Sequence, residues 1–204
     1  MSIRASLYYI HDPMCAWCWG YKPTFSQLIA ALPADIELKY LVGGLAPDSD
    51  EPMPASMREA IPGYWRKIQN LLGTEFNFDF WTQCEPRRST YPACRSVLAA
   101  KKQGKEVEMI AEIQFAYYLH AMNPSDNQTH IELAKKLDIN VEQFTRDLLS
   151  KEIEALLQEL LQFAHQLPIQ GFPSLVLKTS DAYYSIPVDY KSEIGSLEAI
   201  NECV

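Results

Sequence analysis

The sequence predicts an α/β fold in which a long helical segment interrupts a unit of strands and helices. Strand patterns lie near both ends of the chain, at 7–10 and 36–42 and again at 174–177 and 183–188. Between the two pairs, apolar residues recur mainly at helical spacing. A short helical pattern at 197–203 completes the predicted order β-α-β, helices, β-β-α.

The N-terminal part has the pattern of a β-α-β unit. Leu7–Ile10 is an apolar run that is typical of a buried strand. Apolar residues at helical spacing predict a helix over 15–32, and Pro23 is expected to bend it. The segment 36–42 alternates, then becomes apolar, and a Gly-Gly pair ends it.

The middle of the chain differs in composition from both ends. Three prolines between 47 and 54 lie in an acidic, polar linker, and helical patterns follow, the last of them over 151–165. We therefore predict two domains, one formed by residues 1–50 with 168–204, and an inserted helical one formed by residues 51–167.

Local signals mark helix ends within the insertion. A helix is predicted over 106–122, where an Asn-Pro pair stops it. Thr129 with Glu132 resembles a capping box, and Asn140 with Gln143 is a looser version of the same pattern.

The C-terminal part is predicted to form a β-hairpin, with a sharp turn before its first strand. The strand patterns 174–177 and 183–188 flank a polar turn. Gly171-Phe172-Pro173 stands directly before the first of them, after a short link from the last helix of the insertion. An X-Pro bond is cis in only about 5–6% of cases, so the residues alone do not predict a cis bond here.

Composition excludes several classes of function. The 204 residues have a formal net charge of -8, from 26 acidic and 18 basic residues, which argues against nucleic acid or an anionic membrane as partner. The sequence contains no run of about 18 apolar residues, so no membrane span is predicted. The apolar stretch 5–10 is too short for a secretory signal, which predicts a cytoplasmic protein. The acidic charge is compatible with a homodimer.

The chemistry-bearing motif is Cys15-Ala16-Trp17-Cys18, at the junction between the first strand and the following helix. Two thiols at this spacing can form a disulfide within one helical turn. The thiolate is the reactive form, and a helix N-terminus favours it, so Cys15 is the predicted nucleophile. Cys18, one turn deeper, is suited to attack a mixed disulfide formed at Cys15.

Other readings of this pair are weaker. Free cysteines are often buried in cores, and a structural zinc site needs four suitably spaced ligands. Cys84 and Cys94 are too far apart to form a second zinc knuckle, so no metal is predicted. We expect Cys94 to be buried and Cys203 to be an accessible bystander, since it adjoins the C-terminus.

Two further residues near the motif are candidates. His11 stands at the strand end before Cys15 and could stabilise its thiolate or relay protons; alternatively it caps the strand or faces solvent. Trp17 could form an apolar rim for a client, whereas Trp19 is expected in the core.

The strings Asp12-Pro13-Met14-Cys15-Ala16-Trp17-Cys18-Trp19-Gly20 and Gly171-Phe172-Pro173 resemble those of the thioredoxin superfamily. The similarity is to its DsbA-like oxidoreductases with a helical insertion, and within them to the FrnE-like branch, related to 2-hydroxychromene-2-carboxylate isomerases and kappa-class glutathione transferases. It covers nearly the whole chain through the order of elements.

The resemblance implies a thioredoxin-like fold and a thiol-disulfide oxidoreductase. It implies that Cys15 is the exposed nucleophile, Cys18 the resolving thiol, and Pro173 a cis-proline facing them. The Phe172 backbone would pair with an extended substrate segment by strand addition. Partners would be protein or peptide thiols and disulfides, with glutathione as co-substrate and no tightly bound cofactor.

Two other functions stay open on the sequence. One is a glutathione-dependent transferase or isomerase of small aromatic substrates; against it, those relatives use serine where this chain has Cys15. The other is a non-catalytic binder that uses the groove between Trp17 and Phe172. The absence of an export signal leaves the direction of electron flow undecided.

Overall fold

The computed structural model describes residues 3–204. Within them the chain divides into two compact units, one formed by residues up to 43 together with 160–204, the other by residues 44–159. The α/β class and the order β-α-β, helices, β-β-α predicted from the sequence are the ones observed. The predicted domain limits, 1–50 with 168–204 and 51–167, stay a prediction.

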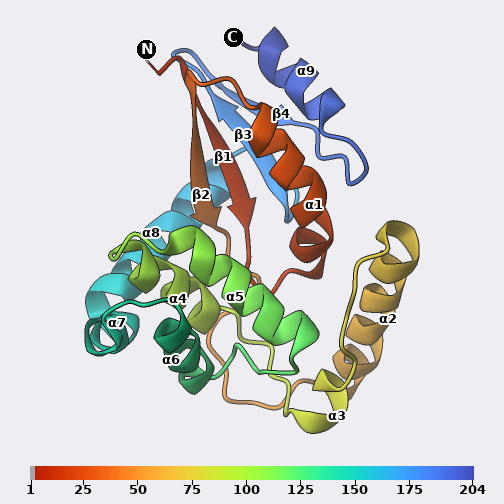
Figure 1. The fold of residues 1–204 in the computed structure, drawn as a ribbon, viewed down its shortest axis with the longest axis vertical. Helices are drawn as coiled ribbons and strands as arrows, with labels where there is room; N and C mark the ends of the chain where they lie inside the picture. Colours follow the sequence, from red (N-terminus) through yellow and green to blue (C-terminus); the bar gives the residue numbers. More distant parts are fainter. Residues whose placement is uncertain (1–2) are drawn as a thin grey trace. The chain divides into compact units, whose positions relative to one another are not determined.

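The first unit is built on a four-stranded sheet with the order β2-β1-β3-β4 (Figure 1). Strand β1 (Ala5–His11) pairs in parallel with β2 (Ile36–Val42) and antiparallel with β3 (Ser174–Lys178). Strand β4 (Tyr183–Ile186) is antiparallel to β3. The central strands therefore join the two ends of the chain.

Alternation along β1 divides its side chains between two cores. Leu7 and Tyr9 face one core, which includes residues of α1 (Ala16–Ala31) and α9 (Ile194–Glu202). Ile10 faces the other, which includes Ala164 and Leu167 from the end of α8 (Lys151–Gln166) and its following turn. Residues i and i+2 of a strand lie on one face, which places Tyr9 and His11 on the same side as α1.

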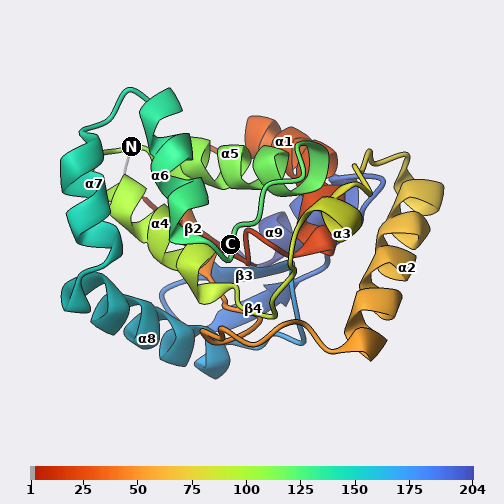
Figure 2. The same cartoon turned by 90° about the horizontal axis from the view of Figure 1, so that it is seen from below.

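The second unit is helical. Its elements are α2 (Ala55–Leu72), α3 (Phe80–Gln83), α4 (Tyr91–Lys101), α5 (Glu106–Leu119), α6 (Asn127–Lys136), α7 (Val141–Leu148) and the first part of α8. Helix α4 packs against α5, α6 and α7, as both ribbon views show (Figures 1 and 2). Buried Trp65 of α2 contacts an aromatic cluster: Phe76, Phe78, Phe80, Trp81, Tyr117 and Tyr118.

Two local expectations in this unit need correction. Helix α5 ends at Leu119 rather than 122, because Ala121 has a positive φ of 51°. The capping box at Thr129 is wrong: α6 begins after Asp126, and the Thr129 hydroxyl donates to the Asn123 carbonyl at 2.8 Å instead. The looser cap is confirmed, because Asn140 accepts a 2.9 Å hydrogen bond from the Gln143 amide.

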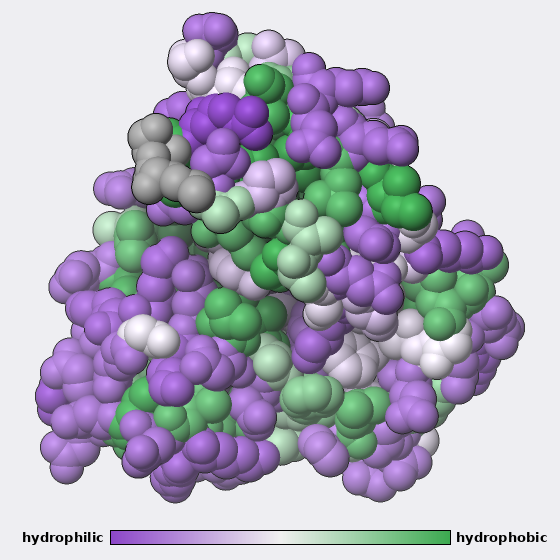
Figure 3. Space-filling view, turned by 45° about the horizontal axis from the view of Figure 1, so that its top comes forward, coloured by the Kyte–Doolittle hydropathy of each residue, from purple (hydrophilic) through white to green (hydrophobic). Residues whose placement is uncertain are grey.

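Several large apolar side chains are exposed. Figure 3 shows one face on which hydrophobic residues form separate small groups among hydrophilic ones. Leu149 and Ile194 are among the most exposed, at 64% and 58%. In the described part of the chain, no helix combines the length and the apolar character needed to cross a membrane.

Candidate active site

Cys15 occupies the N-cap of α1, where the backbone is still extended. Its Sγ accepts a hydrogen bond from the Cys18 amide at 3.4 Å, and its carbonyl accepts the first helical bond, from the Trp19 amide at 3.0 Å. An N-cap side chain faces unpaired backbone N–H groups, which favour negative charge there. The placement predicted for the nucleophile is therefore the one observed.

Cys18 lies one turn into the helix and is less accessible than Cys15. The two residues are 1% and 5% exposed, and both thiols are free. The description of Cys15 as exposed was wrong, because its Sγ is directed towards the Cys18 amide and lies against the Phe172 carbonyl. Burial, followed by the contact with Cys15, raises the pKa of Cys18 well above its ordinary value. The Cys18 thiol is therefore protonated at neutral pH in this arrangement of the site.

Asp12 anchors the turn that leads from β1 into α1. Its carboxylate accepts the Met14 amide at 2.7 Å, and its carbonyl accepts the Cys15 amide at 3.0 Å. Its backbone also hydrogen-bonds Cys18, which lowers the pKa of that thiol, while its charge acts in the opposite direction. Asp12 is fully buried and was predicted only as part of a motif.

Phe172 and Pro173 bring the distant half of the site to the cysteines. The peptide between them is cis, and the Cys15 thiol donates to the Phe172 carbonyl at 3.5 Å across 157 positions of sequence. The Phe172 ring packs with the second core of the sheet and lies over Gly43 so closely that a Cβ there would be 2.1 Å from its Cε1. This close approach explains why a glycine directly follows β2.

His11 is buried in the first core rather than facing solvent. Its ring stacks on Tyr9 with centroids 5.0 Å apart and meets Tyr40 edge-on at 6.0 Å. Both ring nitrogens lack a hydrogen-bond partner among the described residues. Burial lowers the pKa of His11 to about 3, so the imidazole is neutral at neutral pH. A neutral ring supplies no positive charge to a thiolate, and the structure does not support that role.

Two tyrosines that the sequence reasoning missed lie beside the dithiol. Burial, followed by the charges of Cys18 and Cys15, raises the pKa of Tyr9 well above its ordinary value. Tyr190 follows β4, and its pKa is also raised, first by burial and then by Cys18 and Cys15. The Thr24 hydroxyl donates to the Tyr190 carbonyl at 2.8 Å and ties this loop to α1. No sequence motif links either residue to the cysteines.

The tryptophans of the motif differ in exposure. Trp17 is partly exposed and meets Tyr190 edge-on, with ring centroids 5.2 Å apart. Trp19 is 8% exposed, as expected of a core residue, and Lys22 Nζ lies 5.1 Å from its ring centroid. Trp17, in the first turn of α1, and Tyr190 therefore contact each other through their rings.

The remaining cysteines are not part of this site. Cys94 is fully buried in α4, as expected. The Cys84 thiol donates to the Ala121 carbonyl at 2.9 Å, and Cys203 is partly exposed and packs at the edge of the first core. Across residues 3–204, no group of three or more histidine, cysteine or acidic side chains is arranged to hold a metal ion.

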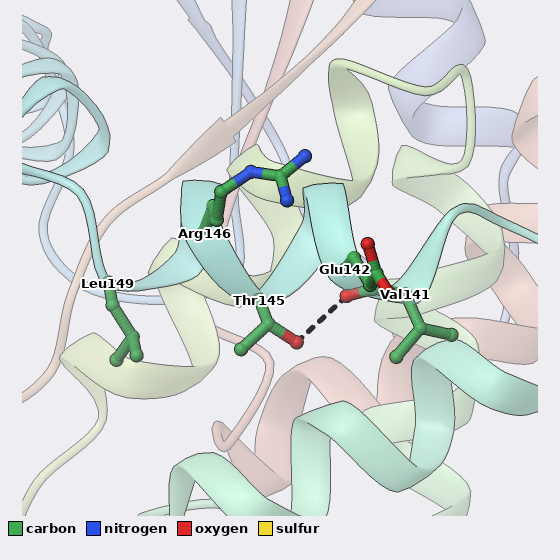
Figure 4. A pocket seen from close by; sticks show the side chains of 5 residues that line it. All are labelled: Val141, Glu142, Thr145, Arg146 and Leu149. Atoms are coloured by element: carbon green, nitrogen blue, oxygen red, sulfur yellow. Dashed lines mark hydrogen bonds between the residues drawn. The ribbon is translucent and has the colours of Figure 1, made fainter.

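A cavity of about 400 Å³ lies along α7 and does not have the chemistry of an active site. It is lined by Val141, Glu142, Thr145, Arg146 and Leu149 (Figure 4). The Thr145 hydroxyl donates to the Val141 carbonyl at 2.8 Å, and this side chain and Leu149 point away from Arg146. The lining contains neither a thiol nor an imidazole.

The comparison with known protein families decides the classification. Residues 8–188 match the thioredoxin family. The match includes the dithiol, the cis-proline and all four strands of the sheet, apart from the first three residues of β1. The chain belongs to the thioredoxin family. The resemblance drawn from the two sequence strings is confirmed at this level, and the FrnE-like branch stays a prediction.

Solved structures that are similar to this chain include proteins named as oxidoreductases. A protein of Nitrosomonas europaea, provisionally assigned as a protein disulfide isomerase, is 27% identical, with a TM-score of 0.85 and coverage of 98% of this chain and 97% of the other. The cytosolic disulfide reductase DsbM of Pseudomonas aeruginosa is 20% identical, with a TM-score of 0.77 and coverage of 97% and 98%. DsbM has also been solved with glutathione.

The curated relatives carry a different description. ClpXP adapter protein SpxH of Halalkalibacterium halodurans is 24% identical over 83% of this chain, and that of Bacillus subtilis is 23% identical over 92%. The chain spans 57% and 64% of the length of these two relatives. The adapter role is that of these longer relatives.

Proposed function

We propose that this protein is a thiol-disulfide oxidoreductase that acts through Cys15 and Cys18 on protein or small-molecule disulfides. One observation carries the proposal: Cys15 caps α1, with its Sγ 3.4 Å from the Cys18 amide and 3.5 Å from the carbonyl of Phe172, next to Pro173. This geometry joins a thiolate-stabilising helix end to a backbone acceptor available for a substrate strand.

The chemistry follows from the two positions. The Cys15 thiolate attacks a substrate disulfide, forms a mixed disulfide and releases one substrate sulfur as a thiolate. Cys18, after losing its proton, attacks Cys15 Sγ, closes the intramolecular disulfide and releases the second sulfur. Two electrons pass from the protein to the substrate, and two thiols of a reductant, for which we propose glutathione, restore the dithiol. The reverse sequence oxidises a substrate dithiol.

Substrate contacts would come from the residues around Cys15. On binding, the Phe172 carbonyl would accept a substrate N–H in place of the Cys15 thiol, adding the substrate as an extended segment before Pro173. Trp17 would pack against an apolar side chain of the client. We further propose a cytoplasmic location, where glutathione is available, and no tightly bound cofactor.

The test is an equilibrium titration of the protein in glutathione buffers, with free thiols counted by alkylation and mass spectrometry. We expect one reversible two-electron transition confined to Cys15 and Cys18. Cys15→Ser should abolish turnover, Cys18→Ser should accumulate the mixed disulfide, and Cys203→Ser should behave as the unaltered protein. Full turnover by Cys15→Ser would contradict the proposal.

The same variants separate two other functions. A glutathione-dependent transferase would bind glutathione saturably and keep transferase activity in Cys18→Ala. The names of the curated relatives favour a role as a ClpXP adapter. A thiol-independent adapter would bind its target equally well as Cys15→Ser, without any disulfide exchange.

A further inference from the structure

Helix α7 divides its side chains between the core of the helical unit and the surface. Phe144 and Leu148 are fully buried, and the helix packs against α4 and α6. Val141 and Thr145 are partly exposed, and Leu149, which directly follows the helix, is 64% exposed. No large apolar side chain in the described part of the chain is more exposed. The outer side of α7 is therefore an apolar surface in contact with solvent.

Two rows of residues, each at a spacing of four, form this outer side. Val141, Thr145 and Leu149 form one row, and Glu142 and Arg146 form the other. Together they line the hollow of about 400 Å³ that Figure 4 shows, and its surface is almost entirely apolar. Rows at this spacing are the ridges through which helices pack. The hollow is therefore the groove between an apolar ridge and a charged one.

The two charges of the second row are not in ion pairs. The Arg146 guanidinium donates to Gln143 Oε1 at 2.9 Å, and within residues 3–204 neither Glu142 nor Arg146 has an oppositely charged partner. This row carries no net charge, although the whole chain has a formal charge of -8. Two copies of the chain can therefore approach each other here with less repulsion than over the rest of their acidic surface.

We propose that this side of α7 is where two copies of the protein associate, with their α7 helices antiparallel about a two-fold axis at Thr145. Such an axis reverses the direction of the second helix, so Val141 of each copy lies beside Leu149 of the other. The small Thr145 side chains meet at the centre and allow the helices to approach closely. The apolar ridge of each copy then enters the groove of the other.

The charged row favours the antiparallel orientation. Along the helix axis, Glu142 lies three residues before Thr145 and Arg146 one residue after it. At about 1.5 Å per residue, the two-fold axis places Glu142 of one copy about 3 Å along the axis from Arg146 of the other, on the same flank. The pair forms twice. In a parallel two-fold pair, the charged rows would lie on opposite flanks and could not meet.

The size of the surface sets the strength of the association. An eight-residue helix is about 12 Å long, so one helix from each copy buries less than the roughly 1,200 Å² of a standard interface. We therefore expect a dissociation constant in the micromolar to submillimolar range. The inference is independent of the proposed function, because Cys15 and Cys18 belong to the other unit.

The first experiment is sedimentation velocity of the full chain between about 5 and 500 µM, a range chosen for a weak interface. We expect a shift from monomer to dimer as the concentration rises. Leu149→Asp should raise the dissociation constant at least about tenfold, because it places a charge in the apolar groove of the other copy. Leu71→Asp is the matched control, since Leu71 is a 52% exposed leucine on α2 of the same unit, and it should leave the dimer unchanged.

The second experiment tests the orientation by exchanging charges. Glu142→Arg and Arg146→Glu, each alone, place like charges opposite each other twice and should raise the dissociation constant at least about tenfold. An equimolar mixture of the two variants should form a heterodimer within about threefold of the unaltered affinity, because opposite charges then face each other in both pairs. Circular dichroism of each variant checks that the helices are retained, and two misfolded variants would not restore association on mixing.

Three results would overturn the inference. A monomer over the whole concentration range would leave this side of α7 to a helix of a different protein. A dimer that Leu149→Asp does not weaken would form through another surface. A dimer that both charge variants weaken, with no recovery in their mixture, would lack the antiparallel two-fold arrangement.

Discussion

Replacing His11 by Phe should make the stability of this protein less dependent on pH. The imidazole is fully buried between Tyr9 and Tyr40, with neither ring nitrogen hydrogen-bonded within residues 3–204. Its pKa is lowered by burial to about 3, against about 6.5 for an unfolded histidine. At pH values between these two pKa values, His11 is protonated in the unfolded chain and neutral in the folded chain.

The sign and size of the effect follow from that difference. A histidine whose pKa is lowered on folding does not reduce the free energy of unfolding at pH values above its unfolded pKa. Stability falls as the pH drops below about 6.5, because the unfolded chain then binds a proton that the folded chain does not. At pH 5.5 the unfolded state gains about 1.4 kcal/mol from protonation of His11, and at pH 4.5 about 2.7 kcal/mol. In a chain of this size, the first figure corresponds to about 3–6 °C in Tm.

The assay is urea unfolding at pH 7.5 and pH 5.5 for the unaltered protein, His11→Phe and His165→Gln, an exposed histidine on α8. The drop in unfolding free energy between the two pH values should be smaller in His11→Phe by about 1.4 kcal/mol and unchanged in His165→Gln. The comparison across pH removes any packing cost of the new ring. An equal drop in all three proteins would refute the burial argument.

Two further substitutions, each with a control substitution, test the packing of each unit by urea unfolding. Gly43→Ala should destabilise the protein by about 1–3 kcal/mol, because the new Cβ must displace the Phe172 ring, while Gly195→Ala, which meets no atom within 4 Å, should stabilise it by about 0.5–1 kcal/mol. Arg95→Met should cost about 1–3 kcal/mol, and less at 1 M salt, because this 13% exposed side chain binds two carboxylates at 2.6 and 2.8 Å. Lys101→Met, which breaks an exposed ion pair, should change stability by less than about 0.5 kcal/mol.

Each pair has an outcome that would contradict it. Equal stability of the two alanine variants would mean that the Phe172 ring moves aside without cost. Equal losses in the two methionine variants would mean that burial of the guanidinium adds nothing to its ion pairs.

Much of the fold was readable from local patterns. Strand β2 was predicted with its observed limits, 36–42, and Asn140 was recognised as a cap, because apolar alternation and side-chain capping act between neighbours in the sequence. Where local signals compete, prediction failed. Thr129 had the pattern of a cap, yet its hydroxyl donates to the Asn123 carbonyl within the preceding turn.

The position of the dithiol was equally local. Cys15 follows a strand and starts a helix within a few residues, so the sequence by itself determined which thiol caps the helix and which lies a turn deeper. Phe172 and Pro173 were found through a family resemblance rather than through pattern. Their contact with Cys15 depends on β1 pairing with β3, which joins residues far apart in the chain.

What only the tertiary structure decided is the environment of those thiols. Sequence could not tell whether His11 faces solvent or the core, and the packed rings of Tyr9 and Tyr40 make it buried and neutral. Nor could it show that both cysteines raise the pKa values of Tyr9 and Tyr190, the second of which follows β4. Local patterns specify backbone conformation, whereas desolvation and hydrogen bonding at a sulfur depend on every segment that packs around it.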